Sequence, residues 1–439
     1  MFMAACVTAA FSEGYQVNLQ STKQAGMGHV GTAMKLGAES MHFNPAGLSY
    51  MDKTVDLSGG ASFILSNVDY DYSSPDGECK YSTDSKMSTP IYLYAGVKIL
   101  DDLAAGISVT NPYGSGLTWP ENWAGAHLVQ SISLKTFAIQ PTVSYKLFND
   151  RLSLGAGMMI MTGDVSIGKA LIPVGWGLLP LVNPQLAPLA QMYPDVAPVQ
   201  AELSGKAKVG LGYNVGVMFD ITDQWTVGAS YRSKVNMKLE EGAAEVSYAN
   251  SMIEQAISPT FSPLESGTFA ASMPMPANLT FGVSYKPVKK LILSADFQYV
   301  FWSAYKQLDI EFSPVELSGY NTSSTKDFSN AFAVRLGGQY SFTSYLDARL
   351  GVYLDKTPVS DEFYSPETPG ADKIGVTAGL SVSPFKNFSI DASFAYVHGI
   401  KKEGVSCPSD SKFLPADDRF SGNYQPTALM PSVGVSYKF

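Results

Sequence analysis

The sequence predicts an all-β fold, a fourteen-stranded antiparallel transmembrane β-barrel preceded by a compact N-terminal segment. The first observation is the chain end, where Val433, Val435, Tyr437 and the terminal Phe439 alternate with small or polar residues, as on the two faces of a strand. The second is that this pattern recurs through most of the chain. The third is composition: only 16% of residues are charged, against roughly 25% in soluble domains. Since no segment approaches the roughly 18 apolar residues of a membrane helix, alternating strands are the remaining way to cross a bilayer.

Composition also excludes several classes of function. The net charge of −9 and the absence of a basic patch argue against a nucleic-acid partner. The four histidines, His29, His42, His127 and His398, have neither metal-ligand nor catalytic-triad spacing. We therefore expect neither an enzyme nor a cofactor.

The N-terminal region divides into two parts. Residues 1–12 read as a partial secretory signal peptide, with small residues around position 10 for cleavage; a buried N-terminal segment is the alternative. Residues 13–52 lack strand alternation, are rich in glycine, and carry apolar residues such as Met27, Val30 and Met41 that need burial. The predicted barrel then occupies residues 53–439.

The strands are predicted from alternation in fourteen stretches of the chain. These are 55–65, 91–99, 103–109, 139–147, 152–160, 209–219, 225–239, 279–285, 291–301, 332–340, 346–352, 374–382, 388–396 and 421–439. In the seventh stretch, Ser230, Arg232, Lys234, Asn236 and Lys238 fall on one face, which predicts a polar, water-accessible lumen along its whole length.

The predicted connections alternate strictly between two lengths. The six short turns are near 100–102, 149–150, 222–224, 287–289, 343–344 and 384–386. The seven long loops are near 67–87, 114–131, 170–205, 242–267, 313–326, 356–371 and 401–420. Outer-membrane barrels have this arrangement, with short periplasmic turns and long outer loops.

Two of the long loops have unusual composition. The third is apolar throughout its first half and includes Trp176, Leu178 and Leu179. The fourth has helical spacing of apolar residues around Ile253 and Ile257. The two loops either pack together to cap the barrel or form a groove for an apolar ligand; these readings are compatible.

Several motifs resemble those of one known family. They are residues 24–28 (QAGMG), 38–46 (AESMHFNPA), 231–235 (YRSKV), 275–278 (MPAN), 301–303 (FWS), 355–359 (DKTPV) and 396–399 (YVHG). With these motifs the chain resembles the FadL/TodX transporters of long-chain fatty acids and aromatic hydrocarbons in bacterial outer membranes. The resemblance covers essentially the whole mature chain. It implies a barrel with an N-terminal hatch (plug) inside the lumen, and uptake by capture at outer loops, a lumen pocket and lateral release into the membrane.

The resemblance also implies where a lateral opening forms. Asn44, Pro45 and Ala46 of the hatch would lie beside a kink in the third strand, which here runs into Asn111, Pro112, Tyr113 and Gly114. Proline cannot donate a ladder hydrogen bond, which independently favours a break at that point. Alternatively, Pro112 merely ends the strand at its loop.

For the ligand pocket, the resemblance implies a basic residue that holds a carboxylate at the outer end of the fifth strand. Lys169 occupies that position, with Lys326 as a second basic candidate; a solvated loop lysine is the alternative for Lys169. Met159, Met161, Val165 and Ile167 would line the pocket or pack on the hatch, and Trp176, Leu178 and Leu179 would belong to the capture groove.

The expected partners are a hydrophobic ligand, the lipid bilayer, and the outer-membrane barrel assembly machinery through the C-terminal Phe439. The main alternative function is a secretion-associated or structural barrel that binds a protein partner. Haem uptake, with His29 or His42 as axial ligand, is a weaker one. Cys79 and Cys407 lie in the first and last outer loops, where an extracytoplasmic disulfide would fit.

Overall fold

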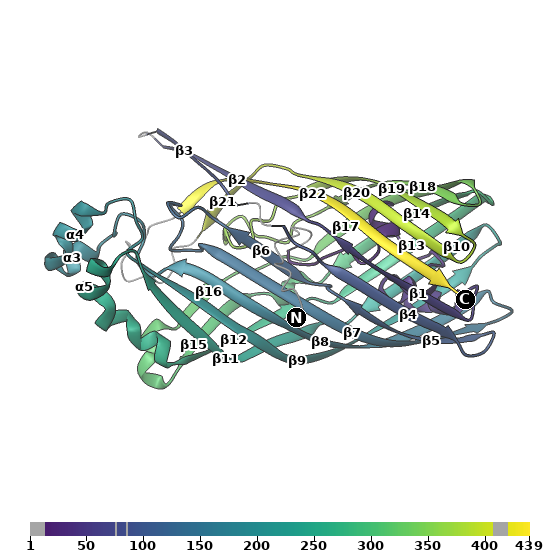
Figure 1. The fold of residues 1–439 in the computed structure, drawn as a ribbon, viewed down its shortest axis with the longest axis horizontal. Coiled ribbons are helices and arrows are strands. Elements are labelled where there is room, and N and C mark those ends of the chain that lie inside the picture. The colour runs from purple at the N-terminus through teal and green to yellow at the C-terminus, as the bar shows by residue number, and fades with distance from the viewer. Residues whose placement is uncertain (1–13, 75–76, 85–86, 407–419) are drawn as a thin grey trace.

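In the computed structural model, the described residues (14–74, 77–84, 87–406 and 420–439) form a closed antiparallel barrel of fourteen strands, several of which are interrupted (Figure 1). The expected signal segment, residues 1–12, lies outside this set. The barrel closes where β1 pairs with β22, from Asp56 opposite Lys438 to Ser62 opposite Ser432. When the segments of each interrupted strand are counted as one strand, every other strand pairs with its neighbours in sequence. The predicted fold class is therefore confirmed.

The strand segments of the barrel wall and its extensions have the following bounds. They are β1 (Val55–Ser62), β2 (Leu65–Ser74), β3 (Gly77–Ser82), β4 (Ile91–Lys98), β5 (Leu103–Thr110), β6 (Gly114–Thr118), β7 (Ser131–Leu147), β8 (Leu152–Ala170), β9 (Val199–Asp220), β10 (Trp225–Arg232), β11 (Val235–Tyr248), β12 (Thr268–Met275), β13 (Asn278–Val288), β14 (Leu291–Val300), β15 (Gln307–Ser313), β16 (Thr322–Thr325), β17 (Ala331–Thr343), β18 (Leu346–Asp355), β19 (Lys373–Phe385), β20 (Phe388–Gly399), β21 (Lys402–Ser406) and β22 (Phe420–Lys438).

The helices are short, and η denotes those of 3-10 type. They are α1 (Thr22–Ala25), η1 (Gly37–Glu39), α2 (Ser40–Phe43), η2 (Pro45–Tyr50), α3 (Leu179–Val182), η3 (Pro184–Leu186), α4 (Ala187–Met192), α5 (Ser251–Phe261), η4 (Ser262–Ser266), η5 (Trp302–Ala304) and η6 (Val315–Tyr320). No helix among the described residues is long and apolar enough to cross a membrane.

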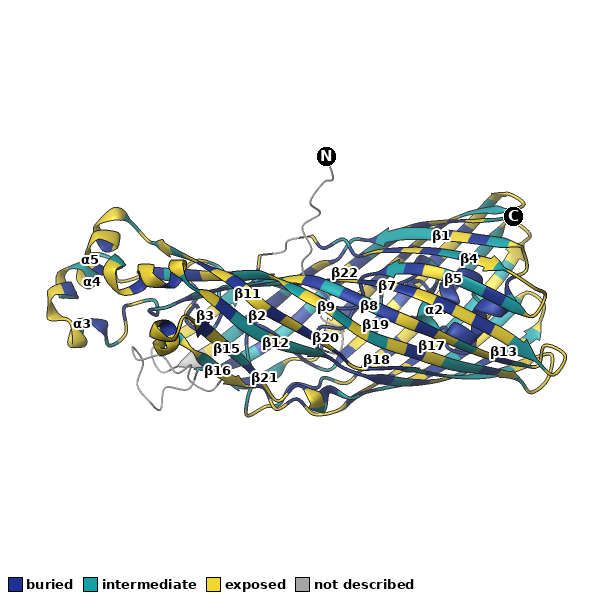
Figure 2. Cartoon of the chain, turned by 90° about the horizontal axis from the view of Figure 1, so that it is seen from below, coloured by how far each residue is buried: buried dark blue, intermediate teal, exposed yellow. Residues whose placement is uncertain are grey.

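The alternation of residue types along the strands matches their burial (Figure 2). In β22, Val433 and Val435 are 52% and 48% exposed on the outer surface, whereas Ser432 and Ser436 on the lumen side are 1% and 6% exposed. A bilayer solvates the first set and the barrel interior the second. The pattern therefore fixes which way each strand faces.

The short turns and long loops are on opposite ends of the barrel, as predicted. Helices α3, α4 and α5 lie at the end opposite the C-terminus (Figure 1). We call the half of the barrel nearest the C-terminus the turn-side half, and the half that carries α3–α5 the loop-side half. The third long loop is shorter than predicted, spanning 171–198, because β8 and β9 remain paired as far as Ala170 opposite Gln200.

The prediction for the seventh strand was wrong in its loop-side half. The strand is broken at 233–234 into β10 and β11, and the break exchanges the two faces. Ser230 and Arg232 are buried in the lumen as expected, but Val235, Met237 and Leu239 are the buried residues of β11. Lys234, Asn236 and Lys238 are exposed. Ser233 inserts between the two registers, since its backbone N–H donates to Tyr213 O and its hydroxyl accepts from Tyr213 N, both at 2.8 Å.

Residues 14–52, which we call the inner segment, lie within the turn-side half of the barrel (Figure 1). Glycines on the lumen face of the strands leave room for this segment. A Cβ atom on Gly155 of β8 would lie 2.2 Å from the carbonyl carbon of Pro45, and one on Gly337 of β17 would lie 2.2 Å from Met27 O. Side chains at these positions would clash with the backbone, so close approach requires glycine.

Candidate functional site

An apolar cavity of about 50 Å³ lies in the loop-side lumen. Its walls come from β7, β8, β9, β11, β12 and β15, together with two residues from the connections. The lining residues are Ile132, Leu134, Gly163, Asp164, Val165, Ile167, Leu203, Ala207, Met237, Leu239, Phe269, Ala271, Ser272, Met273, Tyr305, Leu308, Ile310 and Glu367.

Four predicted pocket residues lie on one face of β8. Val165 and Ile167 line the cavity. Met159 and Met161 are fully buried in the apolar cluster that continues from it. Met159 also marks the lower limit of the apolar region, because its sulfur accepts a hydrogen bond of 2.9 Å from the Arg232 guanidinium.

Lys169 lies two residues beyond Ile167 on the same face of β8, opposite Ala201 of β9. It is half-buried, and the cavity wall on this strand ends at Ile167. The structure therefore places Lys169 outside the cavity, toward the loops.

Lys326, the second predicted basic residue, is near the cavity and already paired. Its side chain is 1% exposed and forms an ion pair with the carboxylate of Glu367, whose side chain is 10% exposed. Glu367 itself lines the cavity. A buried pair of this kind is tolerated because each charge offsets the desolvation of the other.

Glu367 was not predicted, because it lies in the sixth long loop, where no strand pattern indicates its direction. The loop folds into the barrel mouth, and Tyr364, Glu367 and Thr368 are all buried. Two hydrogen bonds hold it there: Trp119 Nε1 donates to Pro366 O at 3.2 Å, and Tyr364 N donates to Val405 O at 3.1 Å. The six consecutive residues 366–371 are all buried, but they are small or polar, so the sequence itself carried no clear signal for an infolded loop.

Trp176 and Leu179 belong to a different apolar cluster outside the barrel, and Leu178 lies beside it in the chain without being part of it. Trp176 and Leu179 are buried against Ile253, Ile257 and Phe261 of α5, while Leu178 is half-buried. The third and fourth loops thus pack together, as one of the two alternatives for them predicted. Several apolar side chains at the tips remain exposed, namely Leu181 (77%), Val182 (69%), Met192 (61%) and Met252 (49%).

The third strand of the barrel is interrupted at residues 111–113, between β5 and β6. It resumes at Gly114, so Pro112 marks a break within the strand rather than its end. The Asn111 side chain replaces the missing ladder: its amide nitrogen donates to Thr136 O at 2.6 Å and its oxygen accepts from Ile91 N at 2.9 Å.

The start of the inner segment runs along this break. Val17 N donates to Pro112 O and Gly114 N donates to Tyr15 O, both at 2.9 Å. The Tyr15 ring packs edge-on against Trp302 and Tyr305, at centroid distances of 4.7 and 5.8 Å. Since Tyr305 lines the cavity, Tyr15 contacts both a wall residue of the cavity and the strand break.

Asn44, Pro45 and Ala46 contact another part of the wall. The Asn44 amide donates to Val217 O in β9 at 3.0 Å, and Ala46 O accepts from the hydroxyls of Ser144 and Ser153 at 2.8 and 2.6 Å. These contacts lie on β7, β8 and β9. The inner-segment residues that contact the break are Tyr15, Val17 and Gln20 instead.

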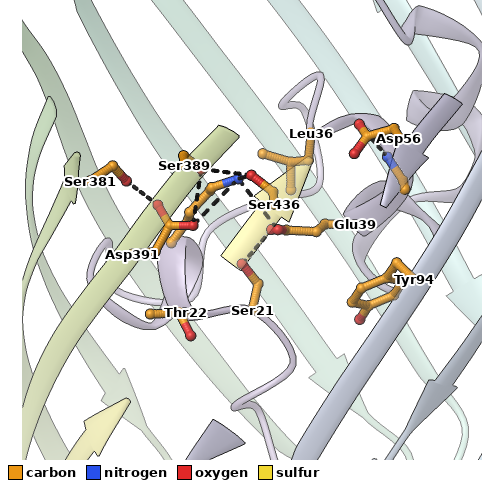
Figure 3. Close-up of polar contacts among 12 residues, drawn as sticks. Ser21, Thr22, Leu36, Glu39, Asp56, Tyr94, Ser381, Ser389, Asp391 and Ser436 are labelled. Carbon is orange, nitrogen blue, oxygen red and sulfur yellow. Dashed lines mark hydrogen bonds and ion pairs between the residues drawn. The ribbon is translucent and has the colours of Figure 1, made fainter. Parts of the chain in front are cut away.

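On the opposite side, the inner segment is held by charges (Figure 3). Lys23 Nζ lies 3.5 Å from the Glu39 carboxylate and 3.7 Å from that of Asp391 in β20, and donates to Ser436 Oγ at 3.0 Å. Ser21 Oγ donates to Glu39 at 2.5 Å. Charge-assisted hydrogen bonds of this type are the stronger ones, so this side is firmly anchored.

A second cavity, of about 40 Å³, lies between the inner segment and the wall and is polar. His29, His42, Arg232, Asp296 and Arg335 are among its lining residues. Asp296 Oδ2 accepts hydrogen bonds from Gly31 N and Thr32 N at 2.8 and 3.0 Å. Burial and the nearby Arg335 lower the pKa of His29 to about 4.

The described residues hold no cluster of three or more His, Cys, Asp or Glu that could bind a metal ion. Cys79 is exposed and free; Cys407, its expected disulfide partner, lies outside the described residues.

Comparison with known proteins agrees with this architecture. The family model described as outer membrane protein transport protein (OMPP1/FadL/TodX) matches residues 3–439. A putative outer membrane protein of Neisseria meningitidis serogroup B is 27% identical over 461 residues, covering 100% of this chain and 96% of the relative. A long-chain fatty acid transport protein of Escherichia coli O6:H1 is 26% identical over 414 residues, covering 90% and 89%.

Solved structures show the same fold. A Pseudomonas aeruginosa FadL homologue superimposes with a TM-score of 0.79 at 20% identity, covering 97% of this chain and 100% of the other. The toluene transporter TbuX of Ralstonia pickettii gives a TM-score of 0.66 at 18% identity, with 97% and 99% covered. The chain therefore belongs to the OMPP1/FadL/TodX family of outer membrane transport proteins.

Proposed function

We propose that this outer membrane protein takes up small hydrophobic molecules through the loop-side cavity. The observation that carries the proposal is an apolar cavity in the lumen that is linked to a break in the barrel wall by Tyr15, which contacts the lining residue Tyr305 and the break itself. Transfer of an apolar molecule from water into such a cavity is favourable by roughly 25 cal/mol per Å² of buried apolar surface. The relatives' names, which include fatty acid and toluene transporters, are consistent with cargo of this kind.

The path has three steps. Exposed apolar side chains at the tips of the third and fourth loops, such as Leu181 and Met192, capture the molecule from water. The molecule then occupies the cavity. It leaves sideways through the break at 111–113, so the membrane interior receives it without passage through the polar turn-side lumen.

In this proposal the inner segment acts as a hatch. Its three hydrogen bonds to the break described above, through Tyr15, Val17 and Gln20, are all between neutral groups. Its other anchors are stronger: Lys23 forms an ion pair with Asp391, and the carbonyl oxygen of Ala46 accepts two hydrogen bonds. The start of the segment is therefore the part that moves, while residues 21–52 stay in place.

We also propose that the C-terminal residue serves barrel assembly. Phe439 pairs through its backbone with Val55, at 2.7 and 3.0 Å, and its ring is 53% exposed on the outer surface. The exposed terminal aromatic ring is available to the barrel assembly machinery before β22 pairs with β1 and closes the barrel. The variant Phe439→Ala should reach the outer membrane in reduced amount but bind ligand normally once folded.

The uptake proposal is tested by filling the cavity. Ala271 lines it and Ala270 is its neighbour on the other face of β12. In cells that lack other hydrophobic-compound transporters, Ala271→Trp should slow uptake of radiolabelled toluene and dodecan-1-ol by about tenfold, equivalent to ~1.4 kcal/mol. Ala270→Trp should leave uptake unchanged. Equal uptake by both variants and wild type would show that cargo does not use this cavity.

A further inference from the structure

The loop-side cavity contains a charge that is already compensated. Lys326 and Glu367 form a buried ion pair, with side chains 1% and 10% exposed, and Glu367 lines the cavity. Each needs the other, because an isolated charge in an apolar environment is strongly disfavoured. The Lys326 ammonium is therefore committed to a partner within the chain.

The two charges are also ordered relative to the cavity. Glu367 is a lining residue, whereas Lys326 is not, so the carboxylate forms the wall and the ammonium lies behind it. An anionic ligand entering the cavity would meet Glu367 first. It would add a second negative charge to a site with a single compensated cation, in surroundings where like charges repel strongly.

Other cations lie outside this cavity. Lys169 is beyond the end of the wall at Ile167, and Arg232 is on the far side of Met159, in the polar cavity. The two charged residues of the lining are both acidic: Glu367 is buried, whereas Asp164 lies on the exposed face of β8.

The cavity nevertheless offers one hydrogen bond. The Tyr305 hydroxyl is buried in the wall, with the residue 1% exposed, and has no hydrogen-bond partner among the described residues. A buried hydroxyl without a partner is costly, and a neutral oxygen on a ligand would satisfy it.

We infer that the cavity takes uncharged apolar molecules, including those with one neutral oxygen, and excludes carboxylates, with Glu367 as the residue that sets this specificity. The inference rests on the uptake function proposed above. The inference goes beyond that function because it chooses between two classes of cargo that the relatives represent, charged and uncharged molecules.

The test compares two ligands of equal chain length, dodecan-1-ol and dodecanoate. Binding to the full-length protein in lipid nanodiscs is measured by equilibrium dialysis at pH 9, where the acid is ionised, and partition into empty nanodiscs is subtracted. The wild type should bind the alcohol at least tenfold more tightly than the carboxylate. Equal affinities, or tighter binding of dodecanoate, would overturn the inference.

Variants of the ion pair sharpen the test. Glu367→Gln leaves the Lys326 charge uncompensated, so affinity for dodecanoate should rise at least tenfold while affinity for dodecan-1-ol changes little. The double variant Lys326→Met/Glu367→Gln removes both charges and should restore the preference of the wild type. Folding of each variant is checked by the heat-dependent mobility shift that a folded barrel shows on gels. If the single variant does not fold, the double variant is compared with the wild type instead. If Glu367→Gln folds and dodecanoate affinity stays unchanged, Glu367 does not set specificity.

Failure of the inference is distinguishable from failure of the uptake proposal. Absence of binding of both ligands by the wild type would refute the cavity as a cargo site, and the inference with it. Binding of both ligands with equal affinity would refute the inference alone. Dodecanoate binding that is lost in Lys169→Ala would place the carboxylate at Lys169 and also overturn the inference.

Discussion

The two halves of the barrel have opposite polarity. In the turn-side half, β8 points Leu154 and Met158 outward, at 46% and 48% exposure, and buries Ser153 in the lumen. In the loop-side half, the same strand turns Val165 and Ile167 inward and exposes Asp164. The barrel is thus apolar outside and polar inside at one level, and apolar inside at the other.

The difference follows from the solvent around each half. The outer surface of the turn-side half must match hydrocarbon, so its polar groups face the lumen and hold the inner segment. The loop-side half carries exposed ion pairs such as Lys208 with Glu240, which need water. Its apolar residues are therefore available to build an interior cavity. A single wall thus provides a polar seat for the inner segment and an apolar chamber for cargo.

The largest expected effect comes from reversing this polarity in the loop-side half. Met237 faces the cavity and Lys238 is exposed on the opposite face. Met237→Asp should abolish binding of dodecan-1-ol and lower the free energy of unfolding by more than about 3 kcal/mol, because a carboxylate would be buried without a partner. Urea unfolding in detergent, followed by tryptophan fluorescence, measures the second quantity.

The matched control for this change is the adjacent residue. Lys238→Asp makes the same new side chain on the outer face and should change stability by less than about 0.5 kcal/mol. Similar losses in the two variants would show that β11 does not face the way the structure places it.

An intermediate effect is expected in the turn-side half. Gly337 and Gly338 are adjacent in β17, but a Cβ on Gly337 would lie 2.2 Å from Met27 O, whereas one on Gly338 would lie 3.2 Å from the Leu293 side chain. Gly337→Ala should therefore weaken docking of the inner segment by about 3 kcal/mol. Hydrogen–deuterium exchange of residues 14–52 should speed up in this variant.

The Gly338→Ala variant is the control for the Gly337 prediction. Its new methyl group meets a flexible side chain on the lipid-facing side, so exchange of the inner segment should match the wild type. If the inner segment of Gly337→Ala were as well protected from hydrogen–deuterium exchange as that of the wild type, the result would contradict the close packing that the structure shows.

The sequence alone predicted the barrel, because alternation along a strand directly reports which residues face lipid. It misjudged the loop-side half of the seventh strand for the same reason. Lys234, Asn236 and Lys238 continue the parity of Arg232, and the extra residue at Ser233 that shifts the register has no clear signal in the sequence. A polar face outside the bilayer looks the same in sequence as a polar lumen.

The candidate site was predicted only where it lies on regular strands. Val165 and Ile167 follow from the alternation of β8, and both line the cavity. Glu367 and Tyr305 come from connecting segments, whose direction depends on tertiary contacts such as that of Trp119 with Pro366 O. The pairing of Lys326 with Glu367 joins residues far apart in the chain, and no local pattern reports it.

The smallest expected effect is a dependence of the turn-side half on pH. His29 is 5% exposed, beside Arg335, Asp355 and the ring of Tyr353, and its pKa is lowered from 6.5 to about 4, chiefly by burial. When the inner segment undocks, His29 regains its ordinary pKa and binds a proton more tightly. Docking is therefore strongest above pH 6.5 and weakens as the pH falls from 6.5 toward 4.

When the pH is lowered from 7.5 to 5.5, protonation of His29 should weaken docking of the inner segment by about 1 kcal/mol. His42 acts in the same direction, since burial and Arg232 also lower its pKa. Hydrogen–deuterium exchange of residues 14–52, corrected for the intrinsic pH dependence of exchange, measures the effect, and His29→Asn should remove its own share. Exchange of β11 and β12 in the loop-side wall should not change, because neither strand contains a histidine. A pH response of equal size in both halves would mean that acid loosens the whole barrel rather than the polar contacts of the inner segment.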